Sequence, residues 1–340
     1  MLYICDFFAN NKEAVSNQID LLKKNTPRSY IFAASIFMNQ KILSISDLRE
    51  GKIILPKFLY EWLLPVIVLL FSGDIHYFEE ESSTIRRNVL NRSQHRLYIS
   101  MYRRPTLEYV KNHLLQYRNL NMVFVELESH KKLLIEFGFD QNKIYVSKTP
   151  SLVDTQHNIK EYDSNNLSLL YASWNTREDN YMFERGKLYM LDFLVRNNNA
   201  TLHIPLRDDN ITEFISEAKK RHVENRVNLI NVHNVDELTS LYKNCDFVMF
   251  TPQIKVTKDV PNSLIDGFAC GKPCIVSSVI DFHEVINKHG LGVIIDDMNK
   301  APIIDISKES YAEMKKRVNS YYEKNHRPEN YLKIREYYNL

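Results

Sequence analysis

The chain has 340 residues, of which 44% are hydrophobic and 25% are charged. This length allows two domains with cores of their own, and the hydrophobic content argues against a disordered chain. The formal net charge is only +2, with a sequence pI of about 8.2, so nucleic acid is not an expected partner.

In the first half, strand-like runs alternate with helical patterns, which is typical of a parallel sheet flanked by helices. We expect strands at 2–8, 30–37, 74–78, 96–101, 122–125 and 143–146. The helices expected between them lie at 12–24, from Lys57 onward, at 83–91, 106–117 and 129–137.

The most apolar segment is 58–71, which contains Glu61 and Pro65 and has 14 residues. This is too short to span a bilayer. We expect a helix buried in the core, with a peripheral membrane contact as the alternative.

Polar residues at 154–166 predict a linker. The pattern then restarts, with strands at 167–172, 200–204, 227–230, 247–250, 274–277 and 292–295. Helices are expected between them, at 186–196, 211–222, 236–243 and 282–288, and after them at 307–319 and 328–338. We therefore divide the chain into a first domain at 1–155, a second at 165–305, and C-terminal helices at 306–340 that pack back toward the first domain.

The segment 259–278 predicts a loop, a short helix, a tight turn and a buried strand. Pro261 suits the first helical position, where its missing N–H costs nothing. Gly271 suits the position just past the helix end, and Pro273 prevents the helix from continuing.

The start of this short helix is the predicted binding site. The backbone amides of Asn262, Ser263 and Leu264 would point out of the helix, and such an end attracts phosphate. Asp266 lies about one turn further in, where its carboxylate could accept hydrogen bonds from ribose hydroxyls. The segment therefore predicts a nucleotide-binding pocket.

The run Asp266-Gly-Phe-Ala-Cys-Gly-Lys-Pro273 resembles the nucleotide-sugar signature of the retaining glycosyl transferases group 1, where a glutamate opens a run like E-A-M-A-C-G-x-P. The segments 235–250 and 124–154 are similar to further units of this family. The resemblance implies the GT-B fold, an α/β architecture of two Rossmann-like doubly wound domains facing across a cleft. It also implies transfer of a sugar from a nucleoside-diphosphate sugar to a hydroxyl acceptor, with retention.

Cations beside the leaving diphosphate would stabilise the charge that develops as the glycosidic bond breaks. The resemblance puts such cations on the loop after the first strand of the second domain, with Arg185 as first choice and Arg177 and Lys187 as candidates for the second. Lys258 stands where the family has its first glutamate, so it could neutralise the diphosphate or meet an acidic donor sugar. The alternative for each is a solvated loop charge.

Three further residues complete the predicted site. His233 lies on the loop that would contact the base, and Arg207 follows a strand at the carboxyl edge of the sheet, where ligands gather. Many family members carry a histidine at a strand tip of the first domain, facing the donor sugar. The strand at 96–101 ends without one, and His76 is the nearest alternative.

The resemblance implies a glycan or a lipid-linked acceptor on the side of the first domain. We expect no cofactor beyond the nucleotide sugar, and no metal, because D-x-D and H-E-x-x-H elements are missing. Two alternatives stay open: a nucleotide-sugar epimerase or hydrolase of the same shape, and a non-catalytic partner subunit. The missing first glutamate and the missing strand-tip histidine favour the second.

The four cysteines form no metal-ligand spacing and no disulfide framework. No basic segment precedes the first apolar residues, so a secretory signal is not expected. Both observations favour a reducing, cytoplasmic location. The protein could in addition attach peripherally to the membrane.

Overall fold

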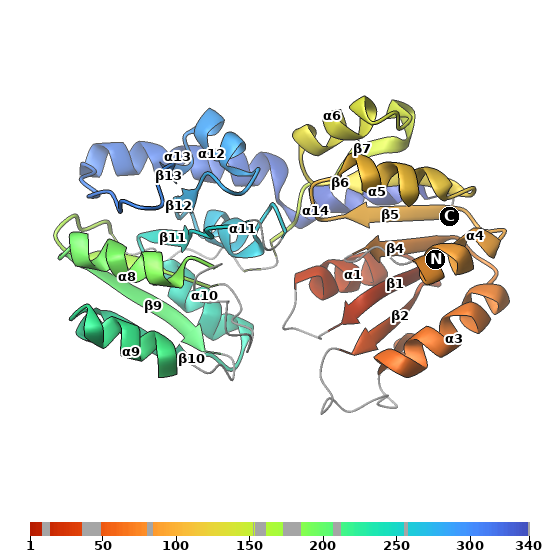
Figure 1. Ribbon diagram of the computed structural model, residues 1–340, viewed down its shortest axis with the longest axis horizontal. Helices are drawn as coiled ribbons and strands as arrows, with labels where there is room; N and C mark the ends of the chain where they lie inside the picture. Colours follow the sequence, from red (N-terminus) through yellow and green to blue (C-terminus); the bar gives the residue numbers. More distant parts are fainter. Residues whose placement is uncertain are drawn as a thin grey trace. The chain divides into compact units, whose positions relative to one another are not determined.

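The computed structural model describes residues 1–8, 14–35, 49–79, 84–151, 153, 161–172, 185–206, 212–254 and 258–338. The chain divides into two compact units. Unit 1 combines Met1–Pro150 with Pro328–Leu340, and unit 2 is Ser151–Arg327. Each unit contains a parallel β-sheet with helices packed against it (Figure 1).

Unit 1 is built on a parallel sheet with the strand order β3-β2-β1-β4-β5-β6-β7. Its strands are β1 (Leu2–Phe8), β2 (Tyr30–Ser35), β3 (Lys52–Pro56), β4 (Ile75–Glu79), β5 (Leu97–Met101), β6 (Leu120–Val125) and β7 (Ile144–Val146). Its helices are α1 (Ala14–Asn25), α3 (Lys57–Leu70), α4 (Thr84–Arg92), α5 (Leu107–Asn112), η1 (Leu114–Gln116), α6 (Glu128–Glu136), η2 (Gln141–Lys143), α14 (Pro328–Leu332) and η4 (Lys333–Tyr337).

Helices cover both faces of the unit 1 sheet because its buried strands carry apolar side chains on both sides. On one face, side chains such as Ile4 and Ile99 pack with α3, α4, α5 and α6. On the other, side chains such as Tyr3 and Tyr98 pack with α1 and with the last residues of the chain. The Tyr98 hydroxyl also donates to the Tyr337 carbonyl at 3.0 Å. The C-terminal segment is therefore part of the core of unit 1.

Unit 2 repeats this plan with the strand order β10-β9-β8-β11-β12-β13, all parallel. Its strands are β8 (Leu167–Leu170), β9 (Ala200–Leu206), β10 (Val227–Asn231), β11 (Phe247–Phe250), β12 (Cys274–Ser277) and β13 (Gly292–Ile295). Its helices are α8 (Lys187–Arg196), α9 (Thr212–Lys220), η3 (Glu224–Arg226), α10 (Val235–Asn244), α11 (Asn262–Ala269), α12 (His283–His289) and α13 (Lys308–Asn325).

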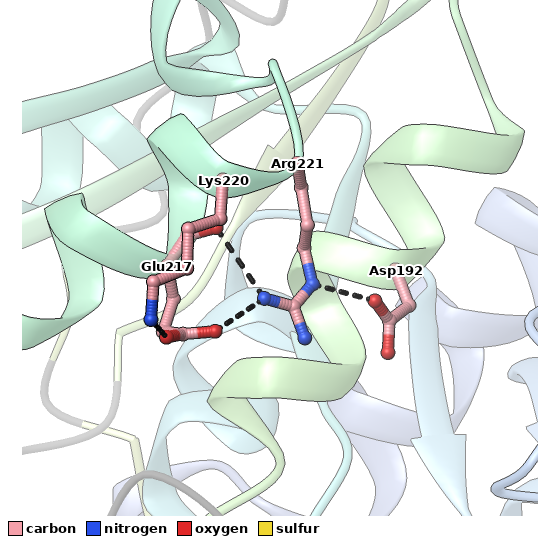
Figure 2. A network of polar contacts seen from close by, with 4 residues as sticks. All are labelled: Asp192, Glu217, Lys220 and Arg221. Carbon is pink, nitrogen blue, oxygen red and sulfur yellow. Dashed lines mark hydrogen bonds and ion pairs between the residues drawn. The ribbon is translucent and has the colours of Figure 1, made fainter.

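An ion-pair network ties the end of α9 to α8 in unit 2 (Figure 2). The Nε of Arg221 lies 2.7 Å from Asp192 of α8, and its Nη1 lies 2.5 Å from Glu217 of α9. Lys220 pairs with the other oxygen of Glu217 at 2.6 Å. The two cations lower the pKa of Glu217, because they favour its ionised form.

The predicted class, parallel α/β with two doubly wound sheets, is confirmed. Two local predictions were wrong. The short strand β3 was missed, since it lies at the edge of the sheet and ends in a proline. The helix expected at 106–117 is instead α5 followed by η1, because His113 between them leaves the helical conformation.

The prediction of a buried helix at 58–71 is confirmed only for one face of the helix. Helix α3 exists as expected, but only Tyr60, Leu64 and Val68 are buried. The opposite face, which includes Trp62 and Leu69, is exposed.

Candidate active site

Unit 2 has its topological switch point between β8 and β11, the neighbouring strands from which the chain winds outward in both directions. In open α/β sheets, ligands bind at the carboxyl ends of the strands at this point. The segments that follow β8 and β11 meet here: Gly186 lies so close to Thr251 that an added Cβ would be 1.6 Å from the Thr251 carbonyl oxygen. Gly186 has φ of 72°, so glycine suits both the backbone conformation and the close approach.

Helix α11 begins at this same edge. Pro261 is its N-cap residue and offers no side-chain hydrogen bond. The Leu264 amide donates to the Pro261 carbonyl at 3.1 Å, so the prediction of an available amide was wrong for Leu264. For the amides of Asn262 and Ser263, the described part of the chain provides no recorded acceptor. These two amides remain suited to an anion.

The other end of α11 agrees with the sequence prediction. Gly271 has φ of 66°, its amide donates to the Phe268 carbonyl, and the Lys272 amide donates to the Gly267 carbonyl, each at 2.9 Å. This is the Schellman arrangement. Gly267 also lies against Val248 of β11, where an added Cβ would come within 2.5 Å of the valine side chain. The helix is thereby fixed closely to the sheet.

Asp266 projects from α11 about one turn after its start and is half-buried. One carboxylate oxygen accepts a hydrogen bond from the Ser151 hydroxyl at 2.8 Å. Ser151 is itself held, because its Oγ accepts from the Val153 amide at 3.1 Å and its amide donates to the His326 carbonyl at 3.1 Å. Ser151 thus positions the carboxylate. Sequence reasoning missed Ser151, since it is 115 residues from Asp266 and belongs to no motif.

Lys258 lies beside the start of α11, where its Nζ donates to the Asn262 side chain at 2.9 Å. A helix N-terminus carries positive partial charge, so a lysine there is electrostatically unfavourable by about 0.3–1 kcal/mol. An anion bound between the two would convert this repulsion into attraction. The contact of Lys258 with the donor diphosphate stays a prediction, and its position beside the start of α11 is compatible with it.

The other predicted cations have different surroundings. Arg185 is half-buried and immediately precedes Gly186 at the switch point. Lys187 is the first residue of α8 and is only 6% exposed. Arg177 and Arg207 lie outside the described residues.

His233 is exposed on the segment after β10, and its amide donates to Glu237 at 2.8 Å. β10 is the edge strand of the sheet and is separated from β8 by β9. His233 therefore lies at the carboxyl edge two strands from β8, and its contact with the base stays a prediction.

The expectation that His76 faces the donor sugar is contradicted. His76 is the second residue of β4 rather than its tip, and its side chain is fully buried in unit 1. Its ring nitrogens contact the hydroxyls of Tyr338 at 2.5 Å and Ser100 at 2.8 Å, and the ring stacks on Phe78. Burial lowers the pKa of His76 to about 3, so the imidazole is a neutral core residue.

Unit 1 carries a polar network of its own near the β1–β4 switch point. Asp6 of β1 forms an ion pair with Arg86 of α4 and accepts from the Tyr77 hydroxyl at 2.9 Å. Glu79, the last residue of β4, accepts from the Tyr109 hydroxyl, and burial raises the pKa of Glu79 to about 7. Sequence analysis missed the network, although Asp6 and Glu79 follow apolar runs in neighbouring parallel strands.

The comparisons with known proteins agree with this architecture. Residues 197–327 match the family described as Glycosyl transferases group 1. No curated protein matches the chain.

Solved structures match over nearly the whole chain. HepE from Anabaena, solved with UDP and glucose, has 12% identity and a TM-score of 0.73, with 98% of both chains covered. Sucrose-phosphate synthase from Thermosynechococcus elongatus has 11% identity and a TM-score of 0.72, with 98% of this chain and 97% of the other covered. WaaG, a glycosyltransferase involved in lipopolysaccharide biosynthesis, has 10% identity and a TM-score of 0.64, with 98% and 99% covered. At such identities the matches establish the fold, and the predicted GT-B architecture is confirmed.

Proposed function

We propose that the chain is a nucleotide-sugar-dependent glycosyltransferase, because residues 197–327 match the glycosyl transferases group 1 family. Unit 2 binds a nucleoside-diphosphate sugar at the β8–β11 switch point. The amides of Asn262 and Ser263 and the ammonium of Lys258 bind the diphosphate, and Asp266 accepts hydrogen bonds from the ribose. The observation that carries the proposal is the meeting of Lys258 with the uncapped start of α11.

The same cations support the chemistry. As the bond between the anomeric carbon and the β-phosphate oxygen breaks, negative charge develops on the leaving diphosphate. Lys258 and Arg185 stabilise this charge, and the stabilisation is larger in the transition state than in the ground state. Lys187, at the start of α8, is a further candidate. No metal ion takes part in this scheme.

We propose retention of configuration at the anomeric carbon. The acceptor oxygen then arrives on the face from which the diphosphate departs. The acceptor hydroxyl loses its proton as the new C–O bond forms, and the leaving phosphate oxygen is the nearest base. The acceptor is a hydroxyl of a glycan or of a lipid-linked glycan.

UDP-sugars are the first donors to test, since HepE was solved with UDP and glucose. Calorimetric titration of the full chain with UDP, GDP, dTDP and CMP and with their sugars measures donor binding. We expect Lys258→Ala to weaken binding of the preferred nucleotide sugar at least tenfold. The matched control Lys219→Ala removes an exposed lysine of α9 and is expected to leave binding unchanged.

Four outcomes would contradict parts of the proposal. Equal affinities of the Lys258→Ala and Lys219→Ala variants would remove Lys258 from the site. Failure of every nucleotide sugar to bind at millimolar concentration would favour the non-catalytic partner subunit. Conversion of the donor without any acceptor, detected by mass spectrometry of the product, would favour the epimerase or hydrolase. Loss of activity with EDTA and its recovery with Mn²⁺ would refute a metal-free site.

A further inference from the structure

Helix α3 of unit 1 has an apolar face that no described residue covers. Its inward face consists of Tyr60, Leu64 and Val68, which pack in the core. Its outward side chains are large and apolar, and each is about half or more exposed: Phe58 70%, Trp62 73%, Val66 46%, Leu69 80% and Leu70 75%. Their spacing of three or four residues, with Leu70 beside Leu69, places them along one side of the helix.

Single exposed apolar residues are ordinary, but a continuous row that includes Trp and Phe marks an interaction surface. From Trp62 through Gly73 the sequence contains no charged residue. The helix is also too short to cross a bilayer, and no described helix is long and apolar enough to do so. The outward face of α3 is therefore suited to contact the surface of a partner, and not to cross a bilayer.

The charged residues near this face indicate what kind of partner it binds. Lys57 is exposed at the start of α3, and α4, which packs beside α3, contains arginines and no acidic residue (Figure 1). Within α4, Arg92 is exposed, and Ile85 adds an apolar side chain that is 74% exposed, whereas Arg87 donates to the Asn112 carbonyl of α5. The only acid on the outward side of α3 is Glu61.

We propose that the outward face of α3, together with the exposed residues of α4, docks on an anionic lipid bilayer. The helix lies in the plane of the interface, with Trp62, Leu69 and Leu70 inserted among the acyl chains and Lys57 and Arg92 at the lipid headgroups. A second copy of the chain is the alternative occupant of this face, and the experiment below distinguishes it from a bilayer. The inference is independent of the proposed donor site in unit 2.

Vesicle flotation tests the docking. The full chain is mixed with vesicles of phosphatidylglycerol and phosphatidylcholine, or of phosphatidylcholine alone, at 0.1 M and 0.5 M salt. We expect flotation with the anionic vesicles, reduced by the higher salt because headgroup contacts are screened. Trp62→Gln combined with Leu69→Gln should lower the partition coefficient at least tenfold, and Arg92→Glu should lower it severalfold.

Matched controls distinguish binding through this surface from nonspecific adsorption to the vesicles. Ile303→Gln changes a 69% exposed apolar residue of unit 2, and Lys219→Glu changes an exposed cation of unit 2. Both should float like the unchanged chain. A Trp174→Phe variant leaves Trp62 as the sole tryptophan, and its emission should shift to shorter wavelength when anionic vesicles are added.

The proposal would be overturned by the absence of flotation with anionic vesicles, or by equal flotation of the double variant and the Ile303→Gln control. It would also be overturned if light scattering found a dimer that Trp62→Gln converts to a monomer, because the face would then bind a second copy. None of these results depends on nucleotide binding, so the donor-site proposal would stand or fall separately.

Discussion

Gly186 offers a direct test of how the two segments at the switch point of unit 2 meet. Replacing Gly186 with alanine places a Cβ 1.6 Å from the Thr251 carbonyl oxygen, where contacts below 3.0 Å do not occur. The backbone on the far side cannot easily retreat. Thr251 is fully buried, and the next carbonyl, that of Pro252, accepts a hydrogen bond from Ser277 at 2.7 Å. We therefore expect both segments to shift apart.

The loss of stability expected for Gly186→Ala has two contributions. An alanine with the positive φ of Gly186 costs about 1–2 kcal/mol of stability, and overpacking against a fixed backbone adds about 1–3 kcal/mol. Gly290→Ala is the matched control, since Gly290 also lies in unit 2 and has φ of 61°. Its Cβ would meet the side chain of Arg317, which can move aside by giving up its exposed 3.0 Å hydrogen bond to the Gly290 carbonyl. The control should therefore cost little more than the conformational part, about 1–2 kcal/mol.

Hydrogen exchange measures this cost unit by unit, which matters because a chain of two units need not unfold in one step. For Gly186→Ala, amides of β11 and α8 should exchange about 30-fold faster or more. For Gly290→Ala, the corresponding increase should stay below about 30-fold. Nucleotide-sugar binding should also weaken in Gly186→Ala, because Arg185 and Lys187 flank the altered residue. Equal exchange in the two variants would refute the close contact of Gly186 with Thr251.

Three further predictions concern the stability of each unit. His76 has a pKa of about 3 in folded unit 1, whereas in the unfolded chain its pKa is near the ordinary value of 6.5. Below pH 6.5 the unfolded chain therefore binds a proton that the folded unit does not bind. The free energy of unfolding should fall as the pH decreases, by about 2 kcal/mol at pH 5. Denaturant unfolding at pH 7 and pH 5 checks this, and His76→Gln should reduce the pH dependence even though it lowers stability at pH 7. Lys272 of unit 2 is fully buried, and its Nζ has no hydrogen-bond partner among the described residues. Burial lowers the pKa of Lys272, because the buried ammonium is disfavoured. Lys272→Met should therefore leave the stability of unit 2 at pH 7 unchanged or raise it. A loss of thermal stability in Lys272→Met would show that the ammonium is needed. Arg221→Ala should lower the stability of unit 2 by at most about 1 kcal/mol, since the ion pairs of Figure 2 are partly exposed, and calorimetry at 0.5 M salt should show a smaller difference.

Much of the site could be predicted from local sequence, because helix ends depend on neighbouring residues. Gly271 follows the end of α11 as expected, whereas Pro261, expected at the first helical position, is instead the N-cap residue with an extended conformation. Lys258 lies near the start of α11 because only three residues separate it from Asn262. Asp266 carries the strongest motif, and the local sequence correctly placed it about one turn into the helix. These features depend on backbone conformations that short segments dictate by themselves.

Other features required contacts between distant parts of the chain. The hydroxyl of Ser151 reaches Asp266 although 115 residues separate them, and the amide of Leu264 is used by a local turn that propensity does not reveal. His76 shows the same limit. Its strand was predicted, but its partner Tyr338 comes from the far end of the chain, and that contact makes it a core residue.

The sequence by itself determined the alternation of strands and helices and the identity of the short signature helix, because periodicity and turn residues act over a few positions. The tertiary structure alone decided which face of α3 is buried and that Gly186 meets Thr251. The tertiary structure also decided that Ser151 holds Asp266 and that His76 is buried beside Tyr338. The physical reason is that burial and the pairing of polar groups depend on which remote segments pack together, and local pattern does not specify that choice.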